Sequence, residues 1–203
     1  MGLSVISAPM LPWVSSNEEG LKIIKDLSLN GKGRYYIHCY LGRDRVFVVK
    51  NMLERLGQHV ASELPKKTVS AENMERFERG KMIRLSRDVV ITPFPTAEEL
   101  FANILNGNVR QVVSLLDSKD PDARKLTLWE AGELKKYAFP FIHLPISRHP
   151  FRPDEALQAA RAVKKLTGIT VVHAYYSNKT SPPVAAFLQA YQTDKLPRLP
   201  AGP

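Results

Sequence analysis

The stretch Arg34-Tyr-Tyr-Ile-His-Cys-Tyr-Leu-Gly-Arg-Asp-Arg-Val-Phe-Val-Val-Lys50 predicts a strand, a polar loop and a helix in immediate succession. The run Tyr35 to His38 is rich in β-forming residues and indicates a short buried strand. The apolar residues from Val46 to Leu56 recur at helical spacing. The single cysteine of the chain, Cys39, is therefore expected where a strand leads into a helix.

This position favours an anion-binding site with a reactive thiol. The first amides of a helix lack intrahelical partners, and the helix dipole adds partial positive charge, so such an end attracts anions and lowers the pKa of a nearby thiol. Arg45, six residues after Cys39, carries a planar guanidinium that can bind two oxygens of an oxyanion. Gly42 permits the left-handed turn that a loop curled around an anion needs.

The pattern His38-Cys39-x5-Arg45 resembles the signature of the protein tyrosine and dual-specificity phosphatase superfamily. The resemblance implies that the Cys39 thiolate attacks phosphorus and that water then hydrolyses the cysteinyl-phosphate intermediate. It implies that the Arg45 guanidinium and the loop amides bind the phosphate oxygens. The substrate-binding residues that it implies are His38, Tyr40, Leu41, Gly42 and Arg43. A buried structural cysteine beside surface arginines is the alternative interpretation, and a packed strand-end histidine is the alternative for His38.

The general acid is the weak point of the resemblance. The family usually carries an Asp on the loop after a strand that ends in Pro, but residues 10–16 and 147–150 contain no carboxylate. Cys-x2-Gly-x-Asp44-Arg45 resembles the loop of myotubularin and other lipid phosphatases, which makes Asp44 the candidate acid. A carboxylate that only braces the loop is the alternative, and Glu18 and Glu19 are further candidates.

A second departure concerns the residue after the loop arginine. The family usually has Ser or Thr there, where the hydroxyl assists breakdown of the intermediate, and this chain has Val46. We therefore expect slow turnover, or a substrate that supplies part of the missing help.

Composition limits the partners and the compartment. The 203 residues include one Cys and carry a formal net charge of +9. One Cys cannot form an internal disulfide, so a reducing, cytoplasmic location is expected, and the N-terminus is a poor signal peptide. The positive charge favours a phosphorylated lipid, inositol or protein substrate and an anionic membrane surface as partners. Nucleic acid is not favoured, because aromatic and basic residues are not interleaved. No metal-binding pattern or cofactor motif is visible.

Strands alternating with helices predict an α/β fold with a mostly parallel sheet flanked by helices. The order from 81 to 191 resembles a dual-specificity phosphatase. We expect a half-domain with the Cys39 loop at 1–58, a linker at 59–80, a phosphatase-like domain at 81–194 and a flexible tail at 195–203. Within the half-domain, residues 3–10 are a further expected strand.

The phosphatase-like domain contains a second, degenerate copy of the strand-helix-strand-loop-helix unit, displaced by 135 to 136 residues. His173-Ala174 aligns with His38-Cys39, and Thr180 stands where Arg45 would be. This copy lacks the chemistry of the signature, and we favour a structural role over anion binding through Lys179 and the loop amides. The half-domain is completed by docking on the second domain, by a segment outside this sequence, or by strands from residues 81–146.

Two functions from different classes remain open. The first is a cysteine-dependent phosphatase that hydrolyses a phosphate monoester. The second is an inactive pseudophosphatase that binds phosphate or phospholipid as a regulatory module. Turnover of a generic aryl phosphate distinguishes them.

Overall fold

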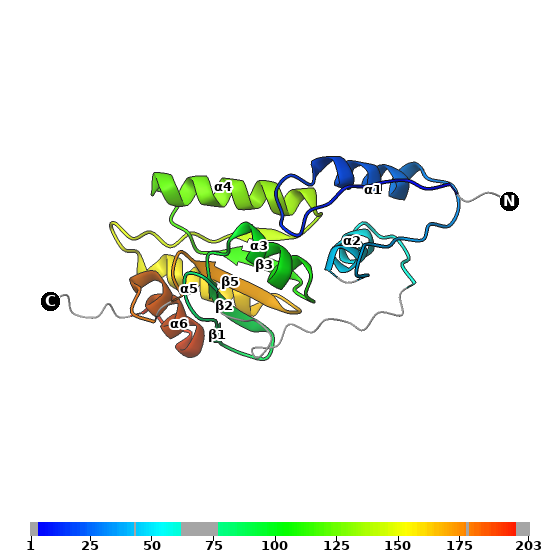
Figure 1. Cartoon of the computed structure of the whole chain (residues 1–203). Coiled ribbons are helices and arrows are strands. Elements are labelled where there is room, and N and C mark those ends of the chain that lie inside the picture. Colours follow the sequence, from blue (N-terminus) through cyan, green and yellow to red (C-terminus); the bar gives the residue numbers. More distant parts are fainter. Residues whose placement is uncertain (1–3, 43, 62–76, 178, 198–203) are drawn as a thin grey trace.

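The computed structural model describes residues 4–42, 44–61, 77–177 and 179–197. Its centre is a five-stranded sheet in the order β1-β2-β5-β3-β4 (Figure 1). The short β1 runs antiparallel to β2, and the other neighbouring strands are parallel. The strands are β1 Ile83–Arg84, β2 Val89–Pro93, β3 Gln111–Ser114, β4 Phe141–His143 and β5 Thr170–Ala174. The expected mostly parallel α/β sheet is confirmed.

The three central strands are short apolar runs, which explains their place in the sheet. Every residue of β2, β3 and β5 is buried. Strands covered on both faces carry continuous apolar runs rather than an alternating pattern. In register, His173 of β5 lies between Thr92 of β2 and Ser114 of β3.

Helices cover both faces of the sheet. The helices are α1 Glu18–Asn30, α2 Asp44–Arg55, α3 Ala97–Glu99, η1 Leu100–Leu105, α4 Pro121–Lys136, α5 Pro153–Lys164 and α6 Pro182–Thr193. One hydrophobic cluster combines buried residues of α1, α2, η1 and α4 with Val90, Val112 and Val171 of the sheet. A second cluster combines α5 and α6 with the opposite face, including Ile91, Val113 and Val172.

Local sequence signals explain where several helices begin. Thr96 accepts a hydrogen bond from the Glu99 backbone, and the Glu99 side chain accepts one from the Thr96 backbone. These two reciprocal bonds form a capping box, which satisfies amides at the start of α3. Helix α4 begins at Pro121, because the Asp120 side chain accepts bonds from the amides of Asp122 and Ala123.

The two strands expected in the first copy are wrong. Residues 4–10 and Tyr35–His38 belong to no strand, and the Tyr36 side chain is 89% exposed. All five described strands lie between residues 83 and 174. A strand needs hydrogen bonds from a neighbouring strand, and the described residues of the first copy pair with neither edge of this sheet. Of the expected repeated unit, the described part of the first copy keeps the two helices, the loop and extended segments.

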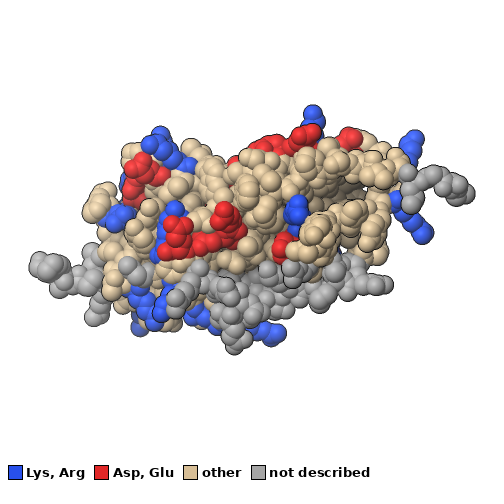
Figure 2. All heavy atoms as spheres, in the orientation of Figure 1, with Lys and Arg blue, Asp and Glu red and all other residues tan. Residues whose placement is uncertain are grey.

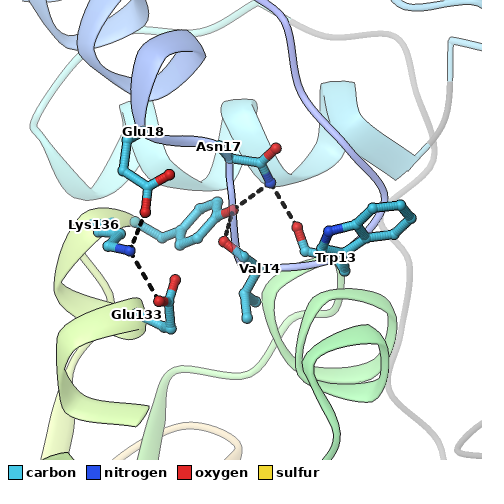
Figure 3. Close-up of polar contacts among 7 residues, drawn as sticks. Trp13, Val14, Asn17, Glu18, Glu133 and Lys136 are labelled. Atoms are coloured by element: carbon cyan, nitrogen blue, oxygen red, sulfur yellow. Dashed lines mark hydrogen bonds and ion pairs between the residues drawn. The ribbon is translucent and has the colours of Figure 1, made fainter. Parts of the chain in front are cut away.

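The N-terminal segment nevertheless packs tightly on the rest of the protein (Figure 3). The hydroxyl of the fully buried Tyr137 donates to Val14 O at 2.9 Å and accepts from Asn17 Nδ2 at 2.8 Å. Lys136 of α4 bridges Glu18 of α1 and Glu133. We call these polar contacts the α4 seam. Residues 4–61 therefore share a core with the sheet, while the predicted domain boundaries stay a prediction. Most of the expected linker, residues 62–76, lies outside the described residues.

Candidate functional site

The Cys39 loop forms a tight turn just before α2. The backbone amide of Gly42 donates to the carbonyl of Cys39 at 3.2 Å, and Gly42 has φ +62°. That left-handed conformation suits a residue without a β-carbon. Cys39 is half-buried, and α2 begins at Asp44. The turn and the helix follow Cys39 as the sequence predicts, although an extended, exposed segment precedes it instead of a strand.

The two charged residues that the sequence proposed at the start of α2 are both held by distant parts of the chain. Arg45 Nη1 donates to Met10 O at 3.1 Å. Asp44 Oδ1 accepts from Asn106 Nδ2 at 3.0 Å. These contacts cross 35 and 62 residues of sequence, and no local signal could have identified Met10 or Asn106 as partners.

The remaining proposed residues lie at the surface. Tyr40 is 92% exposed and Leu41 is 60% exposed. His38 is exposed and its ring stacks on Tyr36, with the ring centroids 6.0 Å apart. The structure therefore brings Cys39, Gly42, Asp44 and Arg45 into one turn and the first residues of one helix. Arg43 lies outside the described residues.

A second place of chemical interest is a cavity at the carboxyl edge of the sheet. It measures about 290 Å³ and opens beside the loop that follows β5, which is the degenerate copy of the signature. Ala174 lies in its wall at the position equivalent to Cys39. Ligands of open α/β sheets commonly bind at this edge. The lining segments are far apart in the sequence, so no local pattern predicts the cavity.

A buried acid-base pair precedes the degenerate loop. His173 Nε2 lies 2.8 Å from Glu130 Oε2, and both side chains are fully buried. The His173 ring also makes an edge contact with Phe94, at 5.3 Å between centroids. His173 is thus part of the core, whereas its counterpart His38 is exposed. This difference agrees with a structural role for the second histidine.

The described residues contain neither a metal-binding cluster nor a helix that could cross a membrane. Among the described residues, no three His, Cys, Asp or Glu side chains are grouped as a metal ion would require. None of the described helices is both long enough and apolar enough to span a bilayer.

No protein-family model and no curated protein matches this sequence. Two crystal structures of a protein from Shewanella putrefaciens CN-32, provisionally described as a phosphatase (DUF442), resemble this chain. The first, at 1.40 Å resolution, has 16% identity and a TM-score of 0.47, and the match covers 61% of this chain and 76% of the other. The second, at 1.60 Å, has 16% identity and a TM-score of 0.44, covering 62% and 74%. Identity this low leaves the function of this chain to be argued from its own residues.

Proposed function

We propose that this protein is a cysteine-dependent phosphatase that hydrolyses a phosphate monoester, with Cys39 as the nucleophile. One observation carries the proposal. A half-buried thiol lies in a turn that Gly42 closes through a left-handed conformation, and this turn leads directly into a helix whose second residue is Arg45. Thiol, glycine turn, helix start and arginine are the parts that an oxyanion-binding nucleophile needs.

The reaction would run in two steps. The Cys39 thiolate attacks phosphorus, the phosphorus–oxygen bond to the leaving group breaks, and Asp44 supplies a proton to the departing oxygen. Water then attacks phosphorus in the cysteinyl-phosphate, the phosphorus–sulfur bond breaks, the thiolate leaves, and the Asp44 carboxylate takes the proton that the water loses. Loop amides and the Arg45 guanidinium stabilise the oxygens on which negative charge concentrates. Val46 offers no hydroxyl for the second step, so breakdown of the intermediate is the slow step.

Arg45 has to bind the phosphate although its guanidinium already donates a hydrogen bond to Met10. Its contact with Met10 uses one of the five N–H donors of the guanidinium. A hydrogen bond from a charged group contributes roughly 1.5–3 kcal/mol. A dianionic phosphate bound by two parallel N–H bonds would exceed that value. Phosphate binding can therefore recruit the free donors of Arg45, or displace Met10 altogether.

The charge balance supports a highly charged substrate. A net charge of +9 favours phosphoinositides and inositol phosphates, with phosphoproteins as a third class, and favours approach to an anionic membrane surface. The aromatic side chains of Tyr36 and Tyr40 next to the loop are almost fully exposed, as residues at a membrane interface often are. A reducing compartment such as the cytoplasm would keep the Cys39 thiol reduced.

A pseudophosphatase that binds phosphate without cleaving it is the second candidate. The observation in its favour is that Asp44 and Arg45 both already have partners, Asn106 and Met10. An acid braced in this way could hold the loop without donating a proton. The two candidates share the phosphate site and differ only in turnover.

Hydrolysis of p-nitrophenyl phosphate tests the proposal. Wild type should release phenolate slowly, and Cys39→Ser and Arg45→Ala should each abolish release while the circular dichroism spectrum stays native. Lys179→Ala, in the degenerate loop, is the matched control and should keep most activity. Full activity in Cys39→Ser would refute the assignment of Cys39 as the nucleophile. No turnover by wild type, with phosphate still bound, would favour the pseudophosphatase.

A further inference from the structure

The end of η1 is wound more widely than an α-helix. The backbone amide of Asn106 donates to the carbonyl of Phe101, five residues earlier in the sequence. Such π-helical turns are rare and are often found at functional sites. Asn106 follows the last residue of η1 and is 2% exposed. An uncommon turn therefore ends on a buried side-chain amide.

Two asparagines join this end of η1 to one face of α2. Asn106 Nδ2 donates to Asp44 Oδ1 at 3.0 Å. Asn51 Nδ2 donates to the carbonyls of Leu105 at 3.0 Å and of Gly107 at 3.1 Å, and so supplies partners that the end of a helix lacks. Asp44 and Asn51 are seven residues apart, about two helical turns, so they lie on one face of α2. Asn51 anchors the two helices, and Asn106 reaches the first residue of α2.

The packing of α2 on η1 also has an apolar part. The hydrophobic cluster that joins the two helices includes the almost completely buried side chains of Val48, Met52, Ile104 and Leu105. Burial of this kind stabilises the interface but has no direction. A hydrogen bond has a preferred length and direction. The bond from Asn106 therefore adds what apolar packing cannot supply, which is a fixed orientation for one carboxylate.

The bond from Asn106 occupies one oxygen of the Asp44 carboxylate. Asp44 is exposed, and among the described residues its Oδ2 makes no hydrogen bond. On the face shown in Figure 2, the described surface over α2 is mainly uncharged. An amide N–H donates to an ionised carboxylate and also to the carbonyl oxygen of a protonated carboxyl. The bond to Oδ1 therefore persists while Oδ2 releases or accepts a proton.

The oxygen of the Asn106 amide is left without a partner. An ionised carboxylate only accepts hydrogen bonds, so Asn106 has to turn Nδ2 towards Asp44. Asn106 Oδ1 is then buried, and among the described residues it has no hydrogen-bond partner. An unsatisfied buried acceptor destabilises the fold, and native proteins keep few of them. A side chain that served only the packing of η1 would be apolar, so this cost points to a role for the bond to Asp44.

We propose that Asn106 is a positioning residue that holds the Asp44 carboxyl with Oδ2 towards the leaving oxygen of the substrate. The inference rests on the proposed phosphatase activity with Asp44 as the acid. As the phosphorus–oxygen bond breaks, the Oδ2–H bond breaks and its proton passes to the leaving oxygen. In the second step Oδ2 takes a proton from the attacking water. Asn106 exchanges no proton and acts through Asp44 alone.

The test compares an alkyl phosphate, glycerol 3-phosphate, with an activated aryl phosphate, p-nitrophenyl phosphate. Asn106→Leu keeps a side chain of similar size and removes the donor. Because a poor leaving group needs the acid, kcat for glycerol 3-phosphate should fall roughly 10- to 100-fold, and kcat for p-nitrophenyl phosphate less than about twofold. KM should change little for either substrate. In Asp44→Asn protein, the addition of Asn106→Leu should slow neither reaction further.

Asn51→Leu is the matched control. It removes the other contact with η1 and leaves the contact with Asp44, so its ratio of alkyl to aryl rates should equal that of wild type. Circular dichroism checks that each variant is folded, and Asn106→Ala replaces Asn106→Leu if the latter does not fold.

The outcomes separate the role of Asn106 from the proposed function. Equal losses on the two substrates in the Asn106 variant, or a further loss in Asp44→Asn protein, would overturn the role of Asn106 alone. Hydrolysis of p-nitrophenyl phosphate but not of glycerol 3-phosphate by wild type would overturn the acid role of Asp44 and, with it, that of Asn106. Hydrolysis of neither phosphate by wild type would refute the proposed phosphatase itself and this inference with it.

Discussion

Replacing Tyr137 by Phe tests the α4 seam, where the N-terminal segment meets α4. The phenol oxygen makes two buried hydrogen bonds, and burial raises the pKa of Tyr137 to about 12, so the hydroxyl keeps the proton that it donates to Val14. The variant leaves the Val14 carbonyl without this donor, while Asn17 keeps its bond to Trp13. An unsatisfied buried acceptor costs about 1–3 kcal/mol. For a chain of this length, about 2 kcal/mol lowers Tm by roughly 4–8 °C.

Tyr191→Phe is the matched control for this measurement. Tyr191 packs against Phe187 on α6, and within the described residues its hydroxyl makes no hydrogen bond. The control should therefore change the free energy of unfolding by less than about 0.5 kcal/mol. Both variants are compared by urea unfolding and by calorimetry. Equal stability of the two variants would refute the buried seam and the packing of residues 4–61 on the sheet.

Three further predictions concern the loop and the seam. Asp44→Asn keeps a side-chain oxygen that can accept the hydrogen bond from Asn106, so the variant removes the acid and keeps the loop. Initial rates should show that hydrolysis of an alkyl phosphate slows by roughly 10²–10⁴-fold and that of an activated aryl phosphate far less. Equal losses would mean that Asp44 only braces the loop. Iodoacetamide should alkylate Cys39 rapidly at about pH 6–7, as measured by mass spectrometry, and phosphate should protect the thiol. Alkylation only at alkaline pH, with no protection by phosphate, would contradict an anion-binding loop around Cys39. The hydrogen bond from Lys136 lowers the pKa of Glu18 below 4.5, so the contribution of this ion pair to stability is present above pH 4.5 and is lost as the pH falls. The Tm of wild type should therefore fall more steeply in acid than the Tm of Glu18→Gln. Parallel curves of Tm against pH would show that this ion pair does not stabilise the fold.

The parts of the fold that depend on local signals could be predicted from the sequence. The apolar runs at Val89–Thr92 and Ile169–His173 became buried strands, because a strand covered on both faces has that composition. The capping box at Thr96–Glu99 formed for an equally local reason. Asp120 followed by Pro121 is also a helix-start signal, and α4 begins at Pro121.

The parts that depend on distant partners could not be predicted in this way. Tyr35–His38 has β-forming residues, but a strand also requires pairing with a neighbouring strand, and this segment pairs with neither edge of the described sheet. The Gly42 turn and the start of α2 follow from the chain itself. The contacts of Arg45 with Met10 and of Asp44 with Asn106 depend on how α2 docks, which the pattern of one segment does not contain.

The most direct test of Cys39 as the nucleophile is rapid-mixing kinetics with p-nitrophenyl phosphate. Because Val46 provides no hydroxyl for breakdown of the intermediate, wild type should release a burst of one phenolate per protein molecule, followed by a slow steady phase. Val46→Ser should speed the steady phase and leave the burst amplitude unchanged, and Cys39→Ser should abolish both. A burst that persists in Cys39→Ser, or steady hydrolysis with no covalent phosphate on Cys39 of wild type, would show that Cys39 is not the nucleophile.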